Sequence, residues 1–587
     1  MPGRTSSRRD VIVVGAGWSG LIAAKTYLDL APETDLQIID SETSIGGVWC
    51  TDRLYPDLYA QVSHPLFEYS FYDMPKEGIT EDGFISGYTI NKYLTSFARD
   101  FKLEELVRFE STVTEVDQTL SGAWILTVAD GYQIECAKLI WAVGPGSSPV
   151  QPTWPKDHFS CPVIHSSDTG KNLELISQAK RVTVVGAAKS AFDTAYFLTK
   201  AGKEVDWIIR ENGGGPIAMG PPTLLGIWNT VDGLSTRAMA MFSPSIMNTS
   251  GFWYNAIHRT PIGRMIAGAY WRTANFLADY AAGYDANDDF KELQPTPRGS
   301  GMFWARAGLG APSAPDFWKT LHSGKLHVHR SEIESLSHIN VVNLNNDTAV
   351  QTDLIIACTG FEKPYRPFSL ELRKELGLTY DETEAIKWAK LHAKAEAKID
   401  ELLPMLKSNT PKVDTANDSI QQVLRGPNRH YRRLIPLKQI AKNERSICFP
   451  GLVHVIFTPT VSEFQALWNA AYLLGMINPP DLDTVEDEIA TFNAWTKKRH
   501  LEMGQKHAYC IFDYLSYIDT LAKDLGIEPR RKNSALAEMF MRYKPSDYRG
   551  MLDEFKASQK AKMGKTVQRP VARSDRSMLR ALHTSHS

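Results

Sequence analysis

The sequence predicts an α/β fold with two strand–helix–strand units, the second inserted into the first, plus a helical insertion and a helical C-terminal extension. Two observations carry this prediction. A buried strand, a glycine-containing turn, a helix and a second strand follow one another near the N-terminus, and the same order returns about 170 residues later. Two further apolar runs end in small residues, at Gly144 and Gly360, where we expect the chain to cross between the units.

The first unit opens on DVIVV, a β-branched run typical of a strand buried on both faces. We expect strands at residues 10–14 and 36–39, with a helix at residues 21–30 between them. The turn GAGWSG joins the first strand to this helix. A dinucleotide turn needs glycine at the tight bend, beside the pyrophosphate and where the helix packs on the strand. Gly15, Gly17 and Gly20 meet these three needs.

Two features after the turn indicate which dinucleotide it holds. Asp40 ends the second strand, where a carboxylate can accept hydrogen bonds from ribose hydroxyls. Gly46, Gly47, Val48 and Trp49 follow, and this second glycine pair lets the backbone pass close to a cofactor. The first unit is therefore interpreted as a Rossmann-like FAD domain. The alternative is a plain glycine turn.

The second unit repeats this order less perfectly. We expect strands at residues 181–185 and 205–209 around a helix at residues 192–199, with the turn GAAKSA at residues 186–191. Gly186 is present, but alanine takes the second and third glycine positions. Alanine is tolerated in the third position, whereas in the second it places a methyl group near the pyrophosphate.

Two cations beside this turn favour NADPH over NADH. Lys189 lies in the turn, and Arg210 stands at the strand end where an NAD site carries an acid. Either cation can pair with a 2′-phosphate. The alternative is two surface cations beside an ordinary turn.

Composition excludes several classes of protein. The net charge is −2, so there is no basic surplus to bind nucleic acid. Six scattered cysteines without a C-x-x-C pair exclude a disulfide scaffold, a zinc site and a dithiol redox centre, and we expect no metal. No signal peptide or transmembrane run is recognised, so a cytoplasmic protein is expected.

The ordered motifs resemble those of the class B flavin monooxygenases, the group of dimethylaniline-type and Baeyer–Villiger enzymes, and the C-terminal part is similar to fungal members. Besides the two glycine turns, the shared motifs are GGVW at 46–49, RLYP at 53–56, F-x-C-x-x-x-H at 159–165, ACTGF at 357–361 and SEFQALW at 462–468. With these motifs, the predicted cofactor-binding set also includes Ala16, Trp18, Ser19, Ser41, Ser190, Thr359, Gly360 and Gln465.

The resemblance implies a monooxygenase reaction. NADPH reduces FAD, dioxygen adds to the flavin, and the resulting flavin hydroperoxide inserts one oxygen atom into a small organic substrate. The stretch rich in Trp, Met, Gly and Pro at about 213–310 suits an apolar substrate, and a tailoring step on a fungal secondary metabolite is expected. That stretch could instead pack between domains or touch a membrane surface. The oligomeric state is left open.

Three positions depart from the family pattern. Cys161 replaces the glycine of the F-x-G-x-x-x-H signature, and Thr169 stands where Baeyer–Villiger members carry tryptophan, which lowers the expectation of ester-forming chemistry. His165 is interpreted as a hydrogen-bonded structural residue between the domains. Gln61 stands near the usual Asn or Asp beside the flavin, so it is the candidate catalytic residue, and the alternative is a polar loop residue.

Other classes of protein share parts of this pattern. Pyridine-nucleotide disulfide reductases share the two-nucleotide plan but need a reactive cysteine pair, which this chain lacks. A Baeyer–Villiger oxygenase of a ketone and an uncoupled or non-catalytic flavoprotein are the remaining alternatives. The expected domains are FAD at 1–165 and 356–480, NADPH at 166–355 with the insertion at about 213–310, a helical extension at 481–555 and a flexible tail at 556–587.

Overall fold

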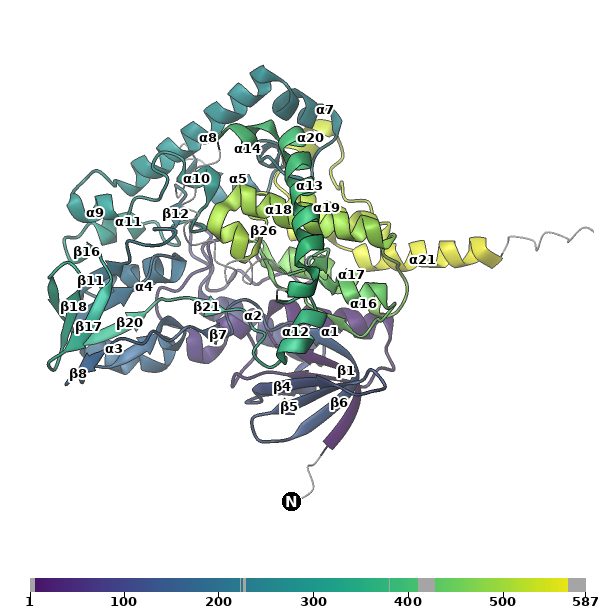
Figure 1. Ribbon diagram of the computed structural model, residues 1–587, viewed down its shortest axis with the longest axis horizontal. Coiled ribbons are helices and arrows are strands. Elements are labelled where there is room, and N and C mark those ends of the chain that lie inside the picture. Colours follow the sequence, from purple (N-terminus) through teal and green to yellow (C-terminus); the bar gives the residue numbers. More distant parts are fainter. Residues whose placement is uncertain (1–5, 222, 225–227, 380, 410–427, 568–587) are drawn as a thin grey trace, which may run out of the picture.

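The computed structural model describes residues 6–221, 223–224, 228–379, 381–409 and 428–567 (Figure 1). Two sheets occupy different regions of the molecule: the first is mixed, with antiparallel β4 and β5 beside its parallel strands, and the second is parallel throughout. The first lies at the bottom of the view, the second lies at the left, and helices of the insertion and of the C-terminal region cover the space above them. The predicted α/β architecture is confirmed.

The first sheet contains both predicted strands of the first unit. Its order is β3-β2-β1-β6-β5-β4, with β24 also paired to β6. Apolar side chains of β1 alternate between two buried clusters, because Val11 and Val13 face one core and Ile12 and Val14 face the other. This explains the unbroken β-branched run. The strands are β1 Ser6–Val14, β2 Leu36–Ile39, β3 Val107–Arg108, β4 Val113–Gln118, β5 Trp124–Val128, β6 Gln133–Trp141 and β24 Ile447–Cys448.

The C-terminal part of the chain returns to this first sheet. Strand β24 pairs in parallel with β6, and helix α17 (Thr458–Leu473) packs against helix α1 (Trp18–Leu30). Both helices are mainly apolar and buried along most of their length. The first unit is therefore discontinuous in sequence, as predicted.

The second sheet holds five parallel strands in the order β16-β11-β10-β20-β9. Helix α4 (Lys189–Lys200) connects β10 to β11, so this is the second predicted unit. A meander of β17, β18 and β19 lies beside this sheet and was missed from the sequence. The five strands are β9 Val163–His165, β10 Arg181–Val185, β11 Glu204–Ile209, β16 Leu326–Arg330 and β20 Leu354–Ala357; those of the meander are β17 Ile333–Ser337, β18 Val341–Leu344 and β19 Ala349–Gln351.

The predicted insertion is largely helical. Two short strands, β12 (Ala218–Met219) and β15 (Leu309–Gly310), pair with each other at its two ends. Its longest helix, α8, runs along the upper left edge of the molecule (Figure 1). The helices are α5 Thr230–Leu234, α6 Arg237–Ala240, α7 Gly251–Tyr254, α8 Pro261–Ala282, α9 Asp288–Glu292 and α10 Gly301–Trp304.

Two C-terminal features differ from expectation. The interleaved Glu and Lys of residues 383–403 predict a solvated helix, yet the helix there, α13 (Ala385–Leu402), buries Trp388, Ala395 and Ile399 and packs against α18 (Leu482–Lys506). Its lysines reach acids of α18, which explains the interleaved charges. The expected tail from residue 556 is helical as far as Val567, within α21 (Met551–Val567), and residues 568–587 lie outside the described part of the chain.

Candidate active site

The first glycine turn is tightly packed in the structure. Gly15 has φ +110°, and a Cβ on it would lie 2.5 Å from the carbonyl oxygen of Ala142. A Cβ on Gly20 would lie 1.8 Å from the carbonyl oxygen of Gly15. Both glycines are therefore required by the backbone, one for the bend and one for the approach of α1 to the strand.

The second glycine segment lies directly opposite this turn. Gly47 has φ +61°, and a Cβ on it would stand 3.1 Å from the Cα of Gly17. The amide of Gly46 donates to the carbonyl of Ala16 at 3.1 Å, which ties the two segments together. The first dinucleotide site is thus lined by bare backbone from two sides.

A cavity open to solvent lies between these segments. It collects most of the residues predicted to bind FAD, namely Gly15, Gly17, Trp18, Ser19, Asp40, Ser41, Gly46, Gly47 and Val48. Its wall also includes residues that sequence reasoning missed, namely Glu42, Arg53, the segment 142–147, Gly451 and Thr458. The small-residue end of β6 was the signal for segment 142–147. The last two positions come from the chain's return to the first sheet.

Asp40 stands at the end of β2, at the rim of this cavity. Its carboxylate accepts from the amide of Ala16 at 2.5 Å and from that of Glu42 at 2.8 Å. Burial raises the pKa of Asp40 above its ordinary value, while these two amides and the nearby Arg53 act to lower it. A carboxylate has further lone pairs, so it can still accept from ribose hydroxyls.

Arg53, from the RLYP motif, closes one side of the cavity. Its guanidinium donates to the Glu42 carboxylate at 2.6 and 3.1 Å and to the carbonyl of Gly146 at 2.9 Å. The pair is largely buried, at 15% side-chain exposure for each partner. It joins the segment after β2 to the segment after β6, so it fixes the two loops between which a dinucleotide would lie.

The residues present fit FAD. Glycines lie where a Cβ would intrude, and the amide ends of the first turn of α1 face the cavity.

Ala16 and Gly20 of the first turn, and four further predicted cofactor residues, lie outside the cavity wall. Gln465 is buried in α17, where it accepts from the amide of Gly451 at 2.9 Å and donates to the Tyr517 hydroxyl at 3.0 Å. Thr359 donates to the carbonyl of Val150 at 2.6 Å, in the crossing between the two sheets. Trp49 and Gly360 are likewise absent from that wall. The structure places these residues in supporting positions around the site.

The second glycine turn has the same backbone plan with less cover. Gly186 has φ +135°, and a Cβ on it would lie 2.3 Å from the carbonyl oxygen of Cys358. Ala188 precedes α4, and both Ala188 and Ser190 are exposed at the helix N-terminus. Their exposure leaves the first turn of α4 open to a phosphate.

The two predicted phosphate cations differ in setting. Lys189 forms an ion pair with Asp193, and its Cδ lies 3.2 Å from where a Cβ on Gly310 would stand. Arg210 is exposed at the end of β11, beside Gly213. Of the two, Arg210 is the cation presented to solvent next to the turn.

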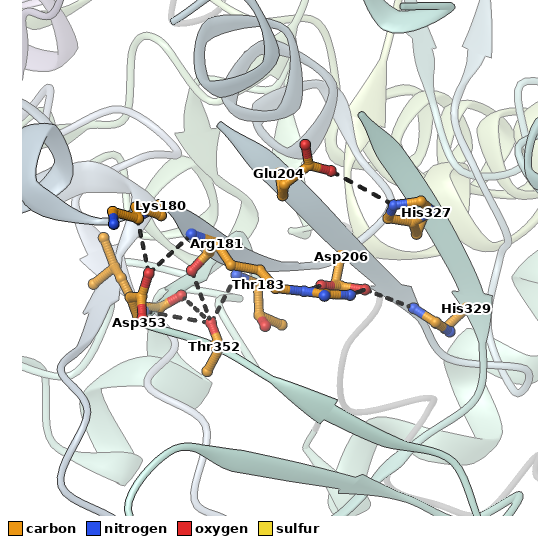
Figure 2. Close-up of polar contacts among 10 residues, drawn as sticks. Lys180, Arg181, Thr183, Glu204, Asp206, His327, His329, Thr352 and Asp353 are labelled. Atoms are coloured by element: carbon orange, nitrogen blue, oxygen red, sulfur yellow. Dashed lines mark hydrogen bonds and ion pairs between the residues drawn. The ribbon is translucent and has the colours of Figure 1, made fainter. Parts of the chain in front are cut away.

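Polar contacts connect the strands of the second sheet near their N-terminal ends, opposite the glycine turn (Figure 2). The buried Asp206 accepts from the guanidinium of Arg181 at 2.5 and 3.1 Å and contacts His329 Nε2 at 3.1 Å. Burial acts to raise the pKa of Asp206, but hydrogen bonds from His329 and Arg181 outweigh it and lower that pKa. Asp353 accepts from the amides of Lys180 and Arg181 at 2.8 and 2.9 Å. These groups hold the strand starts, away from the glycine turn.

His165 has the structural setting expected from the sequence. Its Nδ1 accepts from the amide of Ser167 at 3.1 Å, so its Nε2 carries the proton and donates to the carbonyl of Gly360 at 3.1 Å. Burial lowers the pKa of His165, which favours this neutral form. Cys161 lies near two carbonyls, at 3.2 Å from that of Thr352 and 3.4 Å from that of Ile339.

Gln61 connects the two halves of the molecule. Its Oε1 accepts from the amide of Ala311 at 2.8 Å, directly after strand β15 of the insertion. This bond fixes the side-chain amide so that its Nε2 points away from Ala311. The residue predicted as catalytic therefore lies at the junction of the first unit and the insertion.

Known proteins share this arrangement. Residues 12–217 match the family described as pyridine nucleotide-disulphide oxidoreductase. A FAD-dependent monooxygenase of Alternaria brassicicola is 50% identical over 550 residues, which cover 93% of this chain and 94% of that protein. The chain belongs to the FAD-dependent monooxygenases. It is therefore an oxidoreductase, with FAD as cofactor, and the first unit is its FAD half.

Solved structures show the same fold for this monooxygenase. Cyclohexanone monooxygenase from Rhodococcus sp. Phi1, bound to NADP⁺, gives a TM-score of 0.57 at 16% identity, covering 89% of this chain and 98% of that one. S-allyl-L-cysteine S-oxygenase from Allium sativum gives 0.50 at 15%, covering 95% and 99%. These two are named for different substrates, so the shared fold does not select one. All six cysteines of the monooxygenase are free, which leaves no disulfide centre.

Proposed function

We propose that this monooxygenase consumes NADPH and inserts one oxygen atom from dioxygen into a small apolar organic compound, as a tailoring step in secondary metabolism. The observation that carries the proposal is the second glycine turn. It repeats the backbone plan of the FAD turn, opens the N-terminus of α4, and places the exposed Arg210 at the end of the next strand. Such an arrangement suits a nucleotide with a 2′-phosphate.

The protein groups divide the work between the two sites. The glycine segments and Asp40 hold the flavin nucleotide, and Arg53 keeps the two cavity loops in register. Arg210 binds the 2′-phosphate of the exchangeable nucleotide. FAD, when bound, accepts a hydride from the reduced nicotinamide and then activates dioxygen. The chain positions both nucleotides and excludes water.

An apolar substrate is supported by the packing near Gln61. Ideal Cβ positions on Gly308 and Gly310 of the segment next to Ala311 lie 3.0 Å from Met503 Cε and 2.8 Å from Met219 Sδ. Ile217 lies close to both glycines, at 4.0 and 3.2 Å from the same positions. The surroundings of Gln61 are therefore aliphatic and thioether in character and closely packed, and an apolar substrate is the one compatible with them. Because all the cysteines are free, a reducing compartment such as the cytoplasm is part of the proposal.

The test uses FAD-loaded protein, NADPH and isotopically labelled dioxygen, with a thioether and a cyclic ketone as separate probes. The proposal predicts labelled product from at least one probe, with one NADPH consumed for each oxygen atom inserted. Sulfoxide alone would assign heteroatom oxygenation, and a labelled lactone would assign Baeyer–Villiger chemistry. Formation of one hydrogen peroxide for each NADPH oxidised, with both probes unchanged, would contradict the proposal.

A further inference from the structure

The insertion helix α8 presents an apolar stripe to solvent. Ile262, Met265, Ile266, Phe276 and Tyr280 are exposed by between 51% and 78%. At 3.6 residues per turn, these positions fall within an arc of about 100° and extend along about 27 Å of the helix. Phe252 and Trp253 of the preceding helix α7 add two more exposed aromatic rings, at 74% and 44%.

The other face of α8 is already occupied. It buries Gly263, Ala267, Trp271, Asn275, Ala278 and Ala282. Trp271 packs edge-on against Phe303 and Phe512, with ring centroids 5.3 and 4.9 Å apart, and α8 contacts α10 and β12. A surface helix ordinarily turns polar side chains outward. This helix is apolar on both faces, so its outer stripe requires a separate explanation.

The charges near the stripe favour an anionic partner. Between Asp232 and Asp279 the sequence contains no acidic residue but four arginines; Arg237 is paired with Asp519 and Glu538, which leaves three near α8. Arg259 and Arg272 are exposed, the first just before α8 and the second on it. Basic residues beside an exposed apolar helical face are the pattern of helices that lie in a membrane interface.

The position of α8 and its aromatic residues also favour a membrane interface. Helix α8 forms an outer edge of the molecule (Figure 1). Trp253 stands at the start of the apolar region and Tyr280 at its end, and these two residue types are enriched at membrane–water interfaces. In the part of the chain that the structure describes, none of the helices is both long and apolar enough to cross a membrane.

We propose that α7 and α8 form a docking surface for an anionic phospholipid bilayer, in which the apolar stripe enters the interface and Arg259 and Arg272 contact the headgroups. This contact is separate from the nucleotide sites, because the opposite face of α8 is the one packed against the protein. It is independent of the substrate assigned above.

The experiment measures sedimentation of the full-length, FAD-loaded protein with vesicles. Vesicles of phosphatidylcholine containing phosphatidylserine should bind the protein, and vesicles of phosphatidylcholine alone should bind it several-fold more weakly. The substitutions Ile266→Glu and Phe276→Glu together should lower the partition coefficient at least about tenfold, because each removes an inserted apolar side chain. Ile386→Glu is the matched control, since Ile386 is 74% exposed on α13 and lies away from the stripe.

The variants are compared only where they retain FAD as the parent does. If the two glutamate substitutions prevent folding, Arg259→Gln with Arg272→Gln tests the same surface and should weaken anionic binding about fivefold for each arginine. The proposal is overturned if the parent fails to bind anionic vesicles or if Ile386→Glu loses binding equally. It is also overturned if the stripe variants abolish a dimer in light scattering while vesicle binding stays unchanged.

Discussion

The two glycine turns have nearly the same backbone but different surroundings. Gly17 precedes α1 with φ −92° and ψ −166°, and Ala188 precedes α4 with φ −95° and ψ −177°. Any residue adopts this extended backbone, so glycine at position 17 is not required by its dihedral angles. The two turns differ in what lies opposite the residue that precedes the helix. Gly17 faces the backbone of Gly47, whereas Ala188 is exposed.

This contrast explains how one fold can hold two nucleotides differently. The FAD site is lined by glycine backbone from two sides, with Arg53 holding the loops beside it. The second turn is open, and its neighbouring cation Arg210 is in solvent. A site lined by backbone on two sides suits a resident cofactor, and a turn with exposed surroundings suits a nucleotide that enters and leaves in each cycle.

The largest expected effect comes from the same side chain placed in both turns. Gly17→Val should lower the FAD retained after gel filtration more than tenfold, because the Cβ would already contact the Cα of Gly47 at 3.4 Å and the two methyl groups beyond it would enter the space between the glycine segments. Ala188→Val is the matched variant and should retain FAD while raising the Michaelis constant for NADPH. Flavin absorbance relative to protein measures the first effect and steady-state kinetics the second. Equal loss of FAD in both variants would end the comparison.

Arg210→Ala should have the next largest effect. Loss of a charge-assisted hydrogen bond to phosphate costs about 1.5–3 kcal/mol, so the Michaelis constant for NADPH should rise roughly 10- to 100-fold. The value for NADH should change little, and FAD content should not change. Arg210→Lys serves as the control that keeps the charge. A parallel rise for both nucleotides would show that Arg210 does not bind the 2′-phosphate.

The stability of the two halves should respond to pH with opposite sign. In the FAD half, burial raises the pKa of Glu463 to about 7, although it accepts from the amide and hydroxyl of Ser70 at 2.7 and 2.8 Å. A raised carboxyl pKa contributes stability below the unfolded value, and this is lost as pH rises through about 7. In the second sheet, the lowered pKa of Asp206 contributes stability above its unfolded value, which is lost as pH falls.

Two single variants measure these slopes by thermal unfolding. Between pH 5 and pH 8 the unfolding temperature of the Glu463→Gln variant should fall less than that of the parent protein. Asp206→Asn should be destabilised at neutral pH, with the difference from the parent narrowing in acid. If the dependence of the free energy of unfolding on pH were the same in both variants as in the parent, the two carboxyl groups would not be its cause.

The smallest effect is expected at Gln61. Gln61→Ala removes the bond to the amide of Ala311, which joins the FAD half to the insertion. We expect FAD binding and NADPH affinity to be retained. The fraction of NADPH oxidation that yields hydrogen peroxide instead of product should rise about twofold, the order of magnitude expected for loss of one neutral hydrogen bond. Gln61→Glu keeps an acceptor for Ala311 and is the control. An unchanged peroxide yield would leave Gln61 as a structural tether only.

Much of this arrangement could be predicted from the sequence because it depends on local patterns. The β-branched strands, the glycine turns and Asp40 act within one strand–helix–strand unit, so short segments were sufficient to find them. The insertion could be predicted from its composition, rich in Trp, Met, Gly and Pro, whereas the surface it presents depends on which face of α8 is buried.

What could not be predicted depends on contacts between distant segments. Arg53 lines the FAD cavity because residues 142–147 come beside it, and Gln465 lies outside the cavity because α17 turns it toward Tyr517. The pair of Lys189 with Asp193, by contrast, lies within one turn of α4 and could have been predicted from spacing; it competes with a phosphate role of Lys189. The interleaved Glu and Lys of α13 predict a solvated helix, and its burial depends on the distant helix α18, whose acids pair with its lysines.

The central claim is that a FAD site lined by backbone on two sides and an exposed NADPH site act in sequence. Its most direct test is an anaerobic half-reaction, in which FAD-loaded protein is mixed rapidly with NADPH or NADH and the loss of oxidised-flavin absorbance is followed. The account predicts complete reduction of the bound flavin by NADPH, at concentrations at least about tenfold lower than NADH requires. Flavin that stays oxidised with NADPH, or that is reduced equally well by NADH, would contradict it.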